Sequence, residues 1–470
     1  MSAIGSSDPA TVAQRQAHGK AARERTPRSS HGDWQAAADR RDPIAILQEQ
    51  GTSRVPELLP IRHGRMASSP FAFFRGAAAV MAADLGQTPS SGLRVQLCGD
   101  AHLSNFGVFA SPEREMLFDI NDFDETSPGP FEWDLKRLAA SMGIAGRERG
   151  LSAPEIADVL AWTAQAYRES MRAFAQMGNL AVWYAKLNVQ DVMNVVRQQQ
   201  LTGGKQLARM EKRIQKAREK DSTRAVAKLT ERVDGVLRFR SEPPLVVPIE
   251  ELLEGDERER LRAGMSELLA GYRDSLAEEY QVLLDDYAFT AIARKVVGVG
   301  SVGTRAWVLL LQGRDQNDPL VLQAKEAQES VLEPYAGASR YANHGQRVVE
   351  GQRLMQAAGD VMLGWLPATG VDGVARDFYV RQLWDGKLSV EVAGLDYRLL
   401  RGYGALCAWT LARAHARSGD RVAIASYLGK GGVFDQAIVE FSDAYADQNE
   451  RDHAALLQAI ESGRVQALDA

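Results

Sequence analysis

Two stretches decide the predicted fold: Leu97-Cys98-Gly99-Asp100-Ala101-His102-Leu103-Ser104-Asn105-Phe106-Gly107 and Leu117-Phe118-Asp119-Ile120-Asn121-Asp122-Phe123-Asp124-Glu125. An apolar run ends in Gly-Asp at the start of the first stretch, and a second apolar run leads into three closely spaced carboxylates. Two short strands joined by a polar loop would bring Asp100, Asn105 and one or more of these aspartates together at the opening of one pocket.

Such a set of side chains suits a hard cation. Magnesium takes oxygen ligands, commonly one or two carboxylates or amides, and leaves the rest of its shell to water and phosphate. In phosphoryl transfer, one Asp orients or deprotonates the acceptor, while an Asn and a second Asp hold the metal. The alternative is an acidic turn between two strands with an Asn cap. The spacing from Gly-Asp to Asn, followed by a strand and Asp-Phe-Asp, favours a site.

These residues resemble a known catalytic motif. The segment 99–105 resembles the H-G-D-x-H-x-x-N catalytic loop of aminoglycoside phosphotransferase-like kinases, with Cys98 in the place of the first His. Residues 120–124 resemble the metal-binding I-D-F-G/D segment of these kinases, with Asn121 as an extra residue. Residues 133–138, Trp-Asp-Leu-Lys-Arg-Leu, resemble the Y-D-L-A-R-L helix start that follows.

The resemblance implies a role for each residue of the loop. Asp100 would accept the proton of the acceptor, and His102 would either reach the transferring phosphate or brace the loop. The expected magnesium ligands are Asn105 and Asp122, with Asp124 or Asp119 assisting. Asp134 is expected to tie the start of a helix to the loop. Nearly the whole chain after about residue 25 also resembles a bacterial family catalogued as domain of unknown function 2252, which supplies no activity.

The composition is that of a globular protein without a strong charge bias. The 470 residues are 45% hydrophobic and 25% charged, with a net charge of -5. This length allows a sizeable core and about two to three domains. The charge gives no reason to expect a nucleic-acid partner. Because two cysteines are too few for a disulfide framework, and no apolar run is long enough for a membrane span, we expect a cytoplasmic protein without a membrane partner.

The first 30 residues are basic and lack the apolar core of a signal peptide, so we expect a disordered tail there. Helices are expected after Asp42-Pro43 and after Ser69-Pro70, where each polar residue caps a helix and each proline occupies its first turn. Three arginines, Arg62, Arg65 and Arg75, precede the acidic stretch. They either form ordinary ion pairs with it or build an anion pocket for a phosphate or an acidic acceptor.

The region up to residue 286 is expected to be mostly helical. One helix is predicted from about 132 to 149, and Ser152-Ala153-Pro154-Glu155 is a capping box that opens another toward residue 177. Residues 203–234 are rich in Lys and Arg and read as a helical, solvated face rather than a nucleic-acid patch. Further helices are predicted from about 249 to 286.

A β-meander is predicted from Tyr287 onward. Glycines at 298, 300 and 303 lie between two apolar runs, and a third strand, 320–326, carries Lys325 near its end. Glycines allow backbone amides to approach a phosphate without side-chain interference, although such a turn is commonly a plain hairpin. Two further strands are predicted at 376–384 and 387–392, and a helix at 397–418.

This meander resembles the Gly-rich loop and the V-A-I-K strand of kinases. The resemblance implies that Gly298, Gly300, Ser301 and Gly303 cover the phosphates of ATP and that Lys325 anchors them. Glu350, on a predicted helix at 346–358, is the first candidate to pair with Lys325, and Glu333 is the second. The segment from Gln382 to Asp385 would be the hinge that faces the adenine.

The predicted fold class is therefore α+β, a two-lobed kinase-like fold whose parts occur in circularly permuted order. The catalytic loop and helical lobe come first, and the small antiparallel β-lobe follows. We expect a tail at 1–30, an N-terminal extension with the catalytic loop and helical lobe at 31–286, a nucleotide lobe at 287–392 and C-terminal helices at 393–470. Permutation is tolerated where chain ends lie close together at the surface.

The expected function is an ATP- and magnesium-dependent phosphotransferase acting on a hydroxyl or amine of a small molecule or protein. Other functions remain open at this stage. They are a catalytically silent nucleotide-binding scaffold, a transferase that moves AMP, and a metal-dependent hydrolase that uses the Asp cluster alone. The identity of the acceptor and the oligomeric state are not defined by the sequence, because substrate choice depends on the rim of a pocket.

Overall fold

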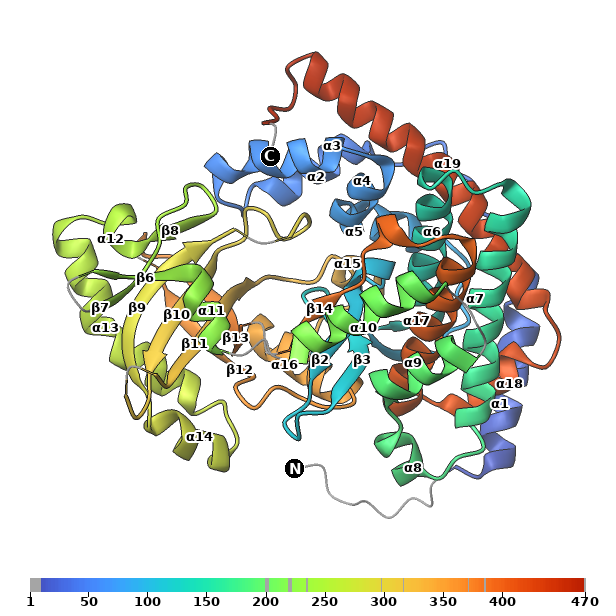
Figure 1. Cartoon of the computed structure of the whole chain (residues 1–470). Coiled ribbons are helices and arrows are strands. Elements are labelled where there is room, and N and C mark those ends of the chain that lie inside the picture. The colour runs from blue at the N-terminus through green and yellow to red at the C-terminus, as the bar shows by residue number, and fades with distance from the viewer. Residues whose placement is uncertain are drawn as a thin grey trace.

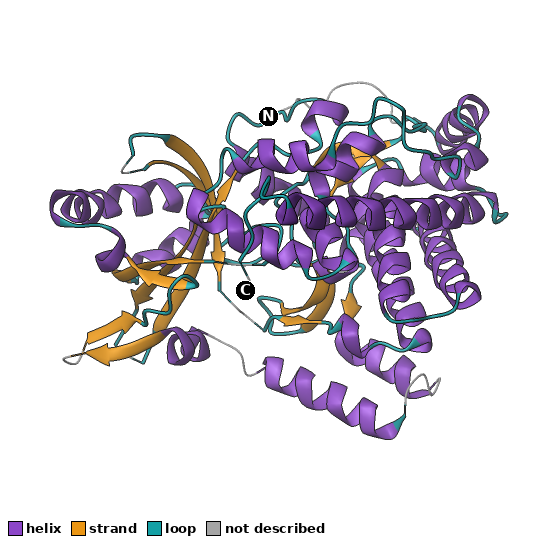
Figure 2. Cartoon of the chain, turned by 90° about the horizontal axis from the view of Figure 1, so that it is seen from above, coloured by secondary structure: helices purple, strands orange, loops and turns teal. Residues whose placement is uncertain are grey.

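The chain forms a mixed α+β structure in which the largest sheet lies on one side and a group of long helices on the other (Figures 1 and 2). The computed structural model describes residues 10–198, 203–218, 222–233, 236–296, 298–315, 317–370, 372–383 and 386–468. Within these residues, no helix is both long enough and apolar enough to cross a bilayer.

The largest sheet contains the predicted β-meander. Its strands lie in the order β12-β13-β11-β10-β9-β8, and all neighbouring strands are antiparallel. In chain order these are β8 (Val246–Pro248), β9 (Ala288–Lys295), β10 (Ala306–Gln312), β11 (Pro319–Ala327), β12 (Gly364–Thr369) and β13 (Ala375–Gln382). Lys325 on β11 lies opposite Ala306 on β10 and Tyr379 on β13.

Helices cover both faces of this sheet. One face packs with Met265 and Tyr272 of α13 and with Leu276, which follows that helix. The helical run here consists of α12 (Ile249–Leu252), α13 (Gly255–Arg273) and α14 (Glu278–Asp285). We expected these helices in the helical lobe. Their apolar side chains instead pack on the main sheet, so residues 246–286 belong with that sheet. On the other face, α11 (Ser222–Leu229) packs on β11, and α16 (His344–Met355) lies against β12 and β13.

A hairpin replaces the end of the predicted charged helical run. After α11 the chain forms β6 (Thr230–Val233) and β7 (Val236–Phe239), which pair with each other. Leu229 and Phe239 are buried against Val308 and Val321 of the main sheet. Burial of these apolar side chains stabilises the extended backbone here, because β-propensity depends on packing more than on local sequence.

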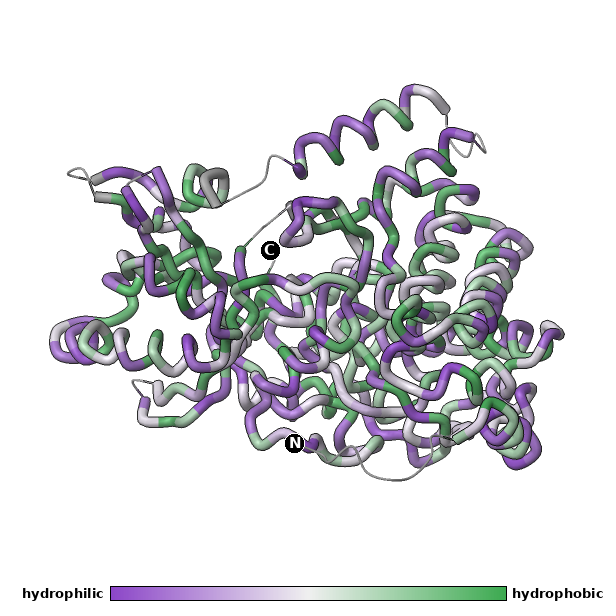
Figure 3. The backbone as a smooth tube through the Cα atoms, turned by 90° about the horizontal axis from the view of Figure 1, so that it is seen from below, coloured by the Kyte–Doolittle hydropathy of each residue, from purple (hydrophilic) through white to green (hydrophobic). Residues whose placement is uncertain are grey.

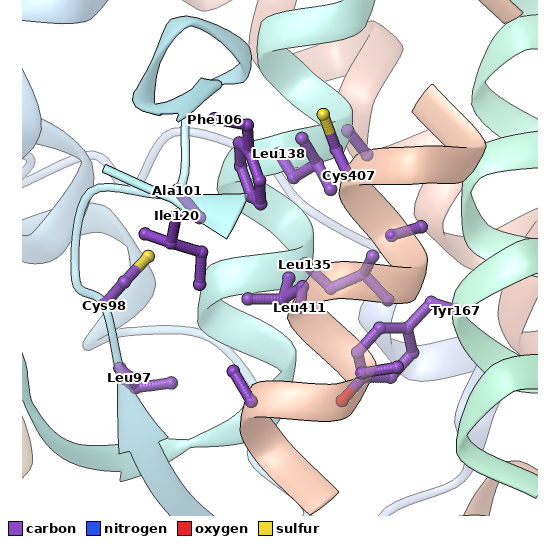
Figure 4. Packing of buried hydrophobic residues seen from close by; sticks show 14 of the residues in the cluster. Leu97, Cys98, Ala101, Phe106, Ile120, Leu135, Leu138, Tyr167, Cys407 and Leu411 are labelled. Carbon is purple, nitrogen blue, oxygen red and sulfur yellow. The ribbon is translucent and has the colours of Figure 1, made fainter. Parts of the chain in front are cut away.

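The helical part is built around α6 (Phe131–Glu148), α7 (Ala153–Phe174), α17 (Tyr397–Ser418), α18 (Arg421–Leu428) and α19 (Val433–Glu461). The predicted capping box opens α7, with Glu155 Oε2 accepting from the Ser152 backbone N at 2.8 Å. Close to the loop that follows β1, Leu135 and Leu138 of α6 meet Cys407 and Leu411 of α17 in a fully buried cluster (Figure 4). The segment 97–106 therefore lies directly on the main core.

The two quoted stretches form short strands beside this core. β1 (Arg94–Leu97) pairs with β4 (Ser127–Pro130), while a second sheet has the order β14-β2-β3-β5. Its strands are β2 (Phe106–Ala110), β3 (Met116–Ile120), β5 (Leu187–Asn188) and β14 (Leu388–Ser389). Because β14 follows β13 in the chain and pairs with β2, this part of the chain links the main sheet to the first quoted stretch. Trp384 and Asp385 of the predicted hinge lie outside the described residues.

The prediction of a disordered N-terminal tail is wrong for residues 12–25, which form α1 (Val12–Arg25). This helix packs on α18, and its basic residues take part in the contact. Arg15 pairs with Asp420 at 2.8 Å, and Arg23 donates to the Tyr427 carbonyl. The basic pattern therefore reflects binding to the C-terminal helices. Residues 1–9 lie outside the described chain.

The predicted helix caps at Asp42 and Ser69 are present. The segment contains α2 (Pro43–Gly51), α3 (Leu59–Ala67), α4 (Pro70–Gly76) and α5 (Ala78–Leu85). The remaining helices are α8 (Asn179–Tyr184), α9 (Val189–Gln198), α10 (Gly204–Arg218) and α15 (Glu333–Ala336). α10 is mainly hydrophilic, with apolar residues recurring along it (Figure 3), and Leu207, Met210 and Ile214 pack toward the core.

Candidate functional site

A cavity of about 1300 Å³ lies where the two halves of the chain meet. Asn121 and Asp122 from the second quoted stretch line it together with Gly298, Ser301 and Lys325 from the β-meander. Gln382 at the end of β13 lines it too, and its backbone N donates to Asp360 Oδ2 at 2.6 Å. The fold thus brings together residues that we predicted from widely separated parts of the sequence.

The cavity wall is strongly basic. Among the described residues that line it, eight are basic: Arg75, Arg114, Arg213, Lys228, Lys295, Lys325, Arg381 and Lys387. Three carry negative charge: Asp122, Asp360 and Glu391. A concave site lined by one sign of charge concentrates ligands of the opposite sign, so this cavity favours anions.

Lys325 forms the central contact of the site. Its Nζ lies 2.5 Å from Asp124 Oδ2 and 3.5 Å from Ser301 Oγ. Tyr379 OH donates to the other oxygen of Asp124 at 2.6 Å, and the Ser301 hydroxyl lies 3.3 Å from Asp124 Oδ2. Asp124 therefore connects the second quoted stretch to β11, β13 and the glycine turn.

Burial and charge act against each other at these groups. Burial favours neutral Lys325, but the carboxylates of Asp122 and Asp124 outweigh it and raise the lysine pKa. Burial also opposes ionisation of Asp124, yet the charge and hydrogen bond of Lys325 hold its pKa well below the usual range. For Asp122, burial and the neighbouring Asp124 carboxylate raise the pKa. Asp124 is thus the firm partner of the lysine, and Asp122 is the carboxylate that faces the cavity.

The glycine turn is held by the N-terminal extension. Val55 N donates to the Gly303 carbonyl at 2.8 Å, and the buried Arg54 donates to the Val302 carbonyl at 2.6 Å. Arg65 donates to the Gly298 carbonyl at 2.6 Å. A Cβ added to Gly300 would lie 3.1 Å from the Arg75 carbonyl oxygen, and Gly303 has a positive φ of 90°. These two positions therefore favour glycine for reasons of close approach and backbone conformation.

Asp100 lies in the loop between β1 and β2, beside the cavity. Arg137 Nε donates to Asp100 Oδ1 at 2.6 Å. The Asp100 side chain is still 20% exposed. Asn105 Nδ2 donates to the Asp100 backbone carbonyl at 2.8 Å and so braces the loop. Neither Asp100 nor Asn105 is among the residues that line the cavity. The backbone of the loop is held further by Asp134, which accepts from the N–H groups of Cys98 and Gly99.

The side chain of His102, in the same loop, is buried, and its Nε2 lies 3.7 Å from Asp100 Oδ2. Burial lowers the pKa of His102 to about 3, so the ring is neutral at physiological pH. A neutral, buried imidazole suits the bracing role better than contact with a phosphate.

The predicted partners of Lys325 are wrong in this structure. Glu350 lies on α16 and pairs with Arg353 at 3.0 Å, one turn along the same helix. Glu333 accepts from the backbone N–H groups of Ser330 and Ser339 and lies 3.6 Å from Arg347. The face of α16 that meets the site carries Arg347, which donates to the Asp124 carbonyl at 2.9 Å. A basic residue thus occupies the place where we expected an acidic one.

Asp119 is also placed differently from the prediction. It pairs with Arg413 at 2.7 Å, both side chains are 1% exposed, and Oδ2 accepts from Ala357 N at 2.8 Å. Asp119 lies on β3, whereas Asp122 follows the end of that strand. Asp119 therefore joins β3 to α17 and does not line the cavity.

Sequence reasoning missed three residues of the site. Tyr379 touches Asp124, Arg381 lies beside Gln323 and the Asn121 carbonyl, and Lys387 lines the cavity. Burial, together with the charge of Arg381, lowers the pKa of Lys387 to about 7. The alternation in Phe378-Tyr379-Val380-Arg381 was the available signal, since it puts Tyr379 and Arg381 on the same face as Lys325 of the paired strand.

The site offers few side-chain ligands for a metal ion. Within the described residues, no group of three or more His, Cys, Asp or Glu side chains is arranged to hold a metal ion. Magnesium, however, commonly takes one or two protein carboxylates and completes its shell with water and substrate phosphates. Asp122, the cavity carboxylate that raises the pKa of Lys325, fits that requirement together with a bound polyphosphate.

One family model matches a range of the chain that contains both parts of this site. A family model described as uncharacterised proteins conserved in bacteria (DUF2252) matches residues 54–459. The chain belongs to this family. No curated protein and no solved structure matches the chain. The matched range begins at Arg54, which holds the glycine turn, and includes Asp100, Asp122, Lys325 and Lys387.

Proposed function

We propose that this protein is a phosphotransferase that binds ATP with magnesium in the basic cavity and transfers the terminal phosphoryl group to a hydroxyl or amine. The observation that carries the proposal is the position of Lys325 between Asp124 and the Ser301 hydroxyl of the glycine turn. With Asp122 beside it, this arrangement provides a lysine to anchor phosphates, an aspartate to bind the metal and a glycine turn, which are recurring parts of phosphoryl-transfer sites.

The charge and size of the cavity support the proposal. Eight basic and three acidic side chains suit a polyphosphate, and about 1300 Å³ exceeds the usual range for one small ligand, roughly 300–1,000 Å³. The cavity therefore has room for a nucleotide and part of a second substrate.

The same contacts support a kinase-like fold in permuted order. In the chain, the glycine turn, the lysine strand and α16 follow the catalytic loop, yet Lys325 and Asp124 are in contact. The antiparallel sheet with α16 between β11 and β12 corresponds to the small lobe in this proposal, and α6, α7 and α17 to the helical lobe. β14 returns the chain from that sheet to β2 of the catalytic region.

Each residue has a defined task in the proposed reaction. Lys325 and the amides of the 298–303 turn hold the phosphates, and Asp122 binds the metal. Magnesium, when bound, would neutralise charge on the phosphate oxygens. A bond forms between the acceptor atom and the terminal phosphorus, the bond from that phosphorus to the bridging oxygen breaks, and the bridging oxygen keeps the electron pair. Asp100, fixed by Arg137 at one oxygen, accepts the acceptor's proton.

Label transfer from ATP tests this proposal. The protein is incubated with magnesium and pools of sugars, amines, lipid head groups and proteins, in parallel with γ-labelled and α-labelled ATP. We expect the γ-label to reach an acceptor, and Asp100→Asn and Lys325→Ala to abolish the transfer.

Three other results would each contradict the proposal. Transfer of the α-label alone would identify an AMP transferase. Nucleotide binding without transfer to any pool would identify a silent binding protein. A metal-dependent hydrolytic activity that Lys325→Ala leaves intact would place the chemistry at the Asp cluster alone.

A further inference from the structure

Arg75 lines the same cavity wall as Asp122 and Lys325, although it comes from the N-terminal extension. It is the penultimate residue of α4, and its backbone carbonyl touches the glycine turn at Gly300. Among the described residues, no group accepts a hydrogen bond from its buried Nε. Arg75 is thus a cation in the cavity with unused hydrogen-bonding capacity.

Two other arginines fix the backbone on both sides of Arg75. Arg137 donates to the Phe74 carbonyl at 2.9 Å, and Arg62 donates to the Gly76 carbonyl at 3.0 Å. Arg137 also holds Asp100, the proposed base, so the same side chain positions the base and the segment that carries Arg75. Donors that are held in place before the reaction stabilise developing charge without reorganisation.

The charge of Arg75 interacts with two carboxylates that the proposed reaction uses. Burial lowers the pKa of its guanidinium, and the carboxylates of Asp100 and Asp122 counteract this effect. Guanidinium groups stay protonated in proteins, so Arg75 carries a positive charge that is attracted to both the proposed base and the proposed metal ligand.

We infer that Arg75 is a catalytic residue that binds the terminal phosphoryl group of the bound nucleoside triphosphate. This inference rests on the proposed function of the cavity. Arg75 donates to the non-bridging oxygens of that group while it moves from the diphosphate to the acceptor, and its charge offsets the negative charge of these oxygens. An arginine supplied from the same chain in this way raises the rate of phosphoryl transfer.

Binding of ATP compared with ADP tests the inference without an acceptor. The dissociation constants of ADP and of a non-hydrolysable ATP analogue are measured with magnesium by calorimetry, in wild type, Arg75→Gln, Arg75→Lys and Arg41→Gln. Arg41 serves as the control because it pairs with Glu49 on the surface, away from the cavity. Thermal unfolding without nucleotide checks that each variant is folded.

We expect Arg75→Gln to weaken binding of the triphosphate analogue roughly ten- to a hundredfold, as for a lost charged hydrogen bond, and to leave ADP binding within about twofold. Arg75→Lys keeps the charge and should fall between wild type and Arg75→Gln, whereas Arg41→Gln should match wild type. Equal loss for both nucleotides, or no loss for either, would overturn the inference while the proposed function stands. If wild type binds neither nucleotide, the proposed function itself is overturned.

Discussion

Lys325 Nζ and Asp124 Oδ2 lie 2.5 Å apart although 201 positions separate the two residues in the chain. Asp124 belongs to the acidic stretch after β3, and Lys325 to the third strand of the β-meander. Tyr379, which lies opposite Lys325 on β13, completes the contact through the second oxygen of Asp124. The pair therefore ties the two halves of the chain together at the wall of one cavity.

Asp124→Asn should destabilise the protein far more than Glu350→Gln. Asp124 accepts a charged hydrogen bond from the buried Lys325, and such bonds contribute about 1.5–3 kcal/mol to folding. Glu350 makes only a partly exposed i,i+3 pair with Arg353, for which about 0.2–0.5 kcal/mol is usual. Chemical denaturation of the two acid-to-amide variants measures both losses. An equal or larger loss for Glu350→Gln would mean that Lys325 pairs with Glu350 in solution.

The affinity for anions should depend on pH through Lys387. Its pKa is lowered to about 7, so the side chain gains a positive charge as the pH falls through 7. An anion in the cavity stabilises the charged form, so binding takes up a proton and affinity rises toward lower pH. We expect ADP to bind more tightly at pH 6 than at pH 8, with a smaller rise in Lys387→Met.

ADP itself titrates in this range. The decisive quantity is therefore the difference between wild type and Lys387→Met in how much the affinity for ADP changes with pH. Identical pH profiles for wild type and Lys387→Met would show that Lys387 does not change its charge when the ligand binds.

Asp119→Asn should unfold the protein at markedly lower denaturant concentration. The change leaves the buried Arg413 without its charged partner, and breaking a buried ion pair in this way costs about 3–5 kcal/mol. The matched control is Asp443→Asn, which breaks one exposed contact of Arg147 and should cost about 0–1 kcal/mol. A loss below about 1 kcal/mol for Asp119→Asn would contradict the structural role of the pair.

Many helices and strands could be predicted because helix caps and turns are marked by residues close together in the sequence. Asp42, Ser69 and Ser152 cap the helices expected after them, and the helix expected at 397–418 is α17. The β-meander was readable because glycines and polar turns separate its apolar runs. The N-terminal helix α1 was missed because its stabilising contacts, such as Arg15 with Asp420, join the two ends of the chain.

The site was predictable in its residue types but not in its pairing. Lys325, Ser301 and Asp122 could be named from spacing, and they do line one cavity. Which carboxylate meets Lys325 depends on the rotation of α16, and the sequence allowed Glu350 where Arg347 faces the site. The roles of Tyr379 and Arg381 depend on the register of β13 against β11, which is set by tertiary packing.

Thermal unfolding with and without ATP plus magnesium, in wild type, Asp122→Ala and Lys325→Ala, tests the central claim most directly. A ligand that binds only the folded protein raises the unfolding midpoint by an amount that grows with the logarithm of its concentration over the dissociation constant. We predict a magnesium-dependent rise in wild type that both substitutions weaken, because Asp122 and Lys325 line one cavity. No rise in wild type at saturating nucleotide, or a rise that both variants retain in full, would contradict a nucleotide site formed by the two halves of the chain.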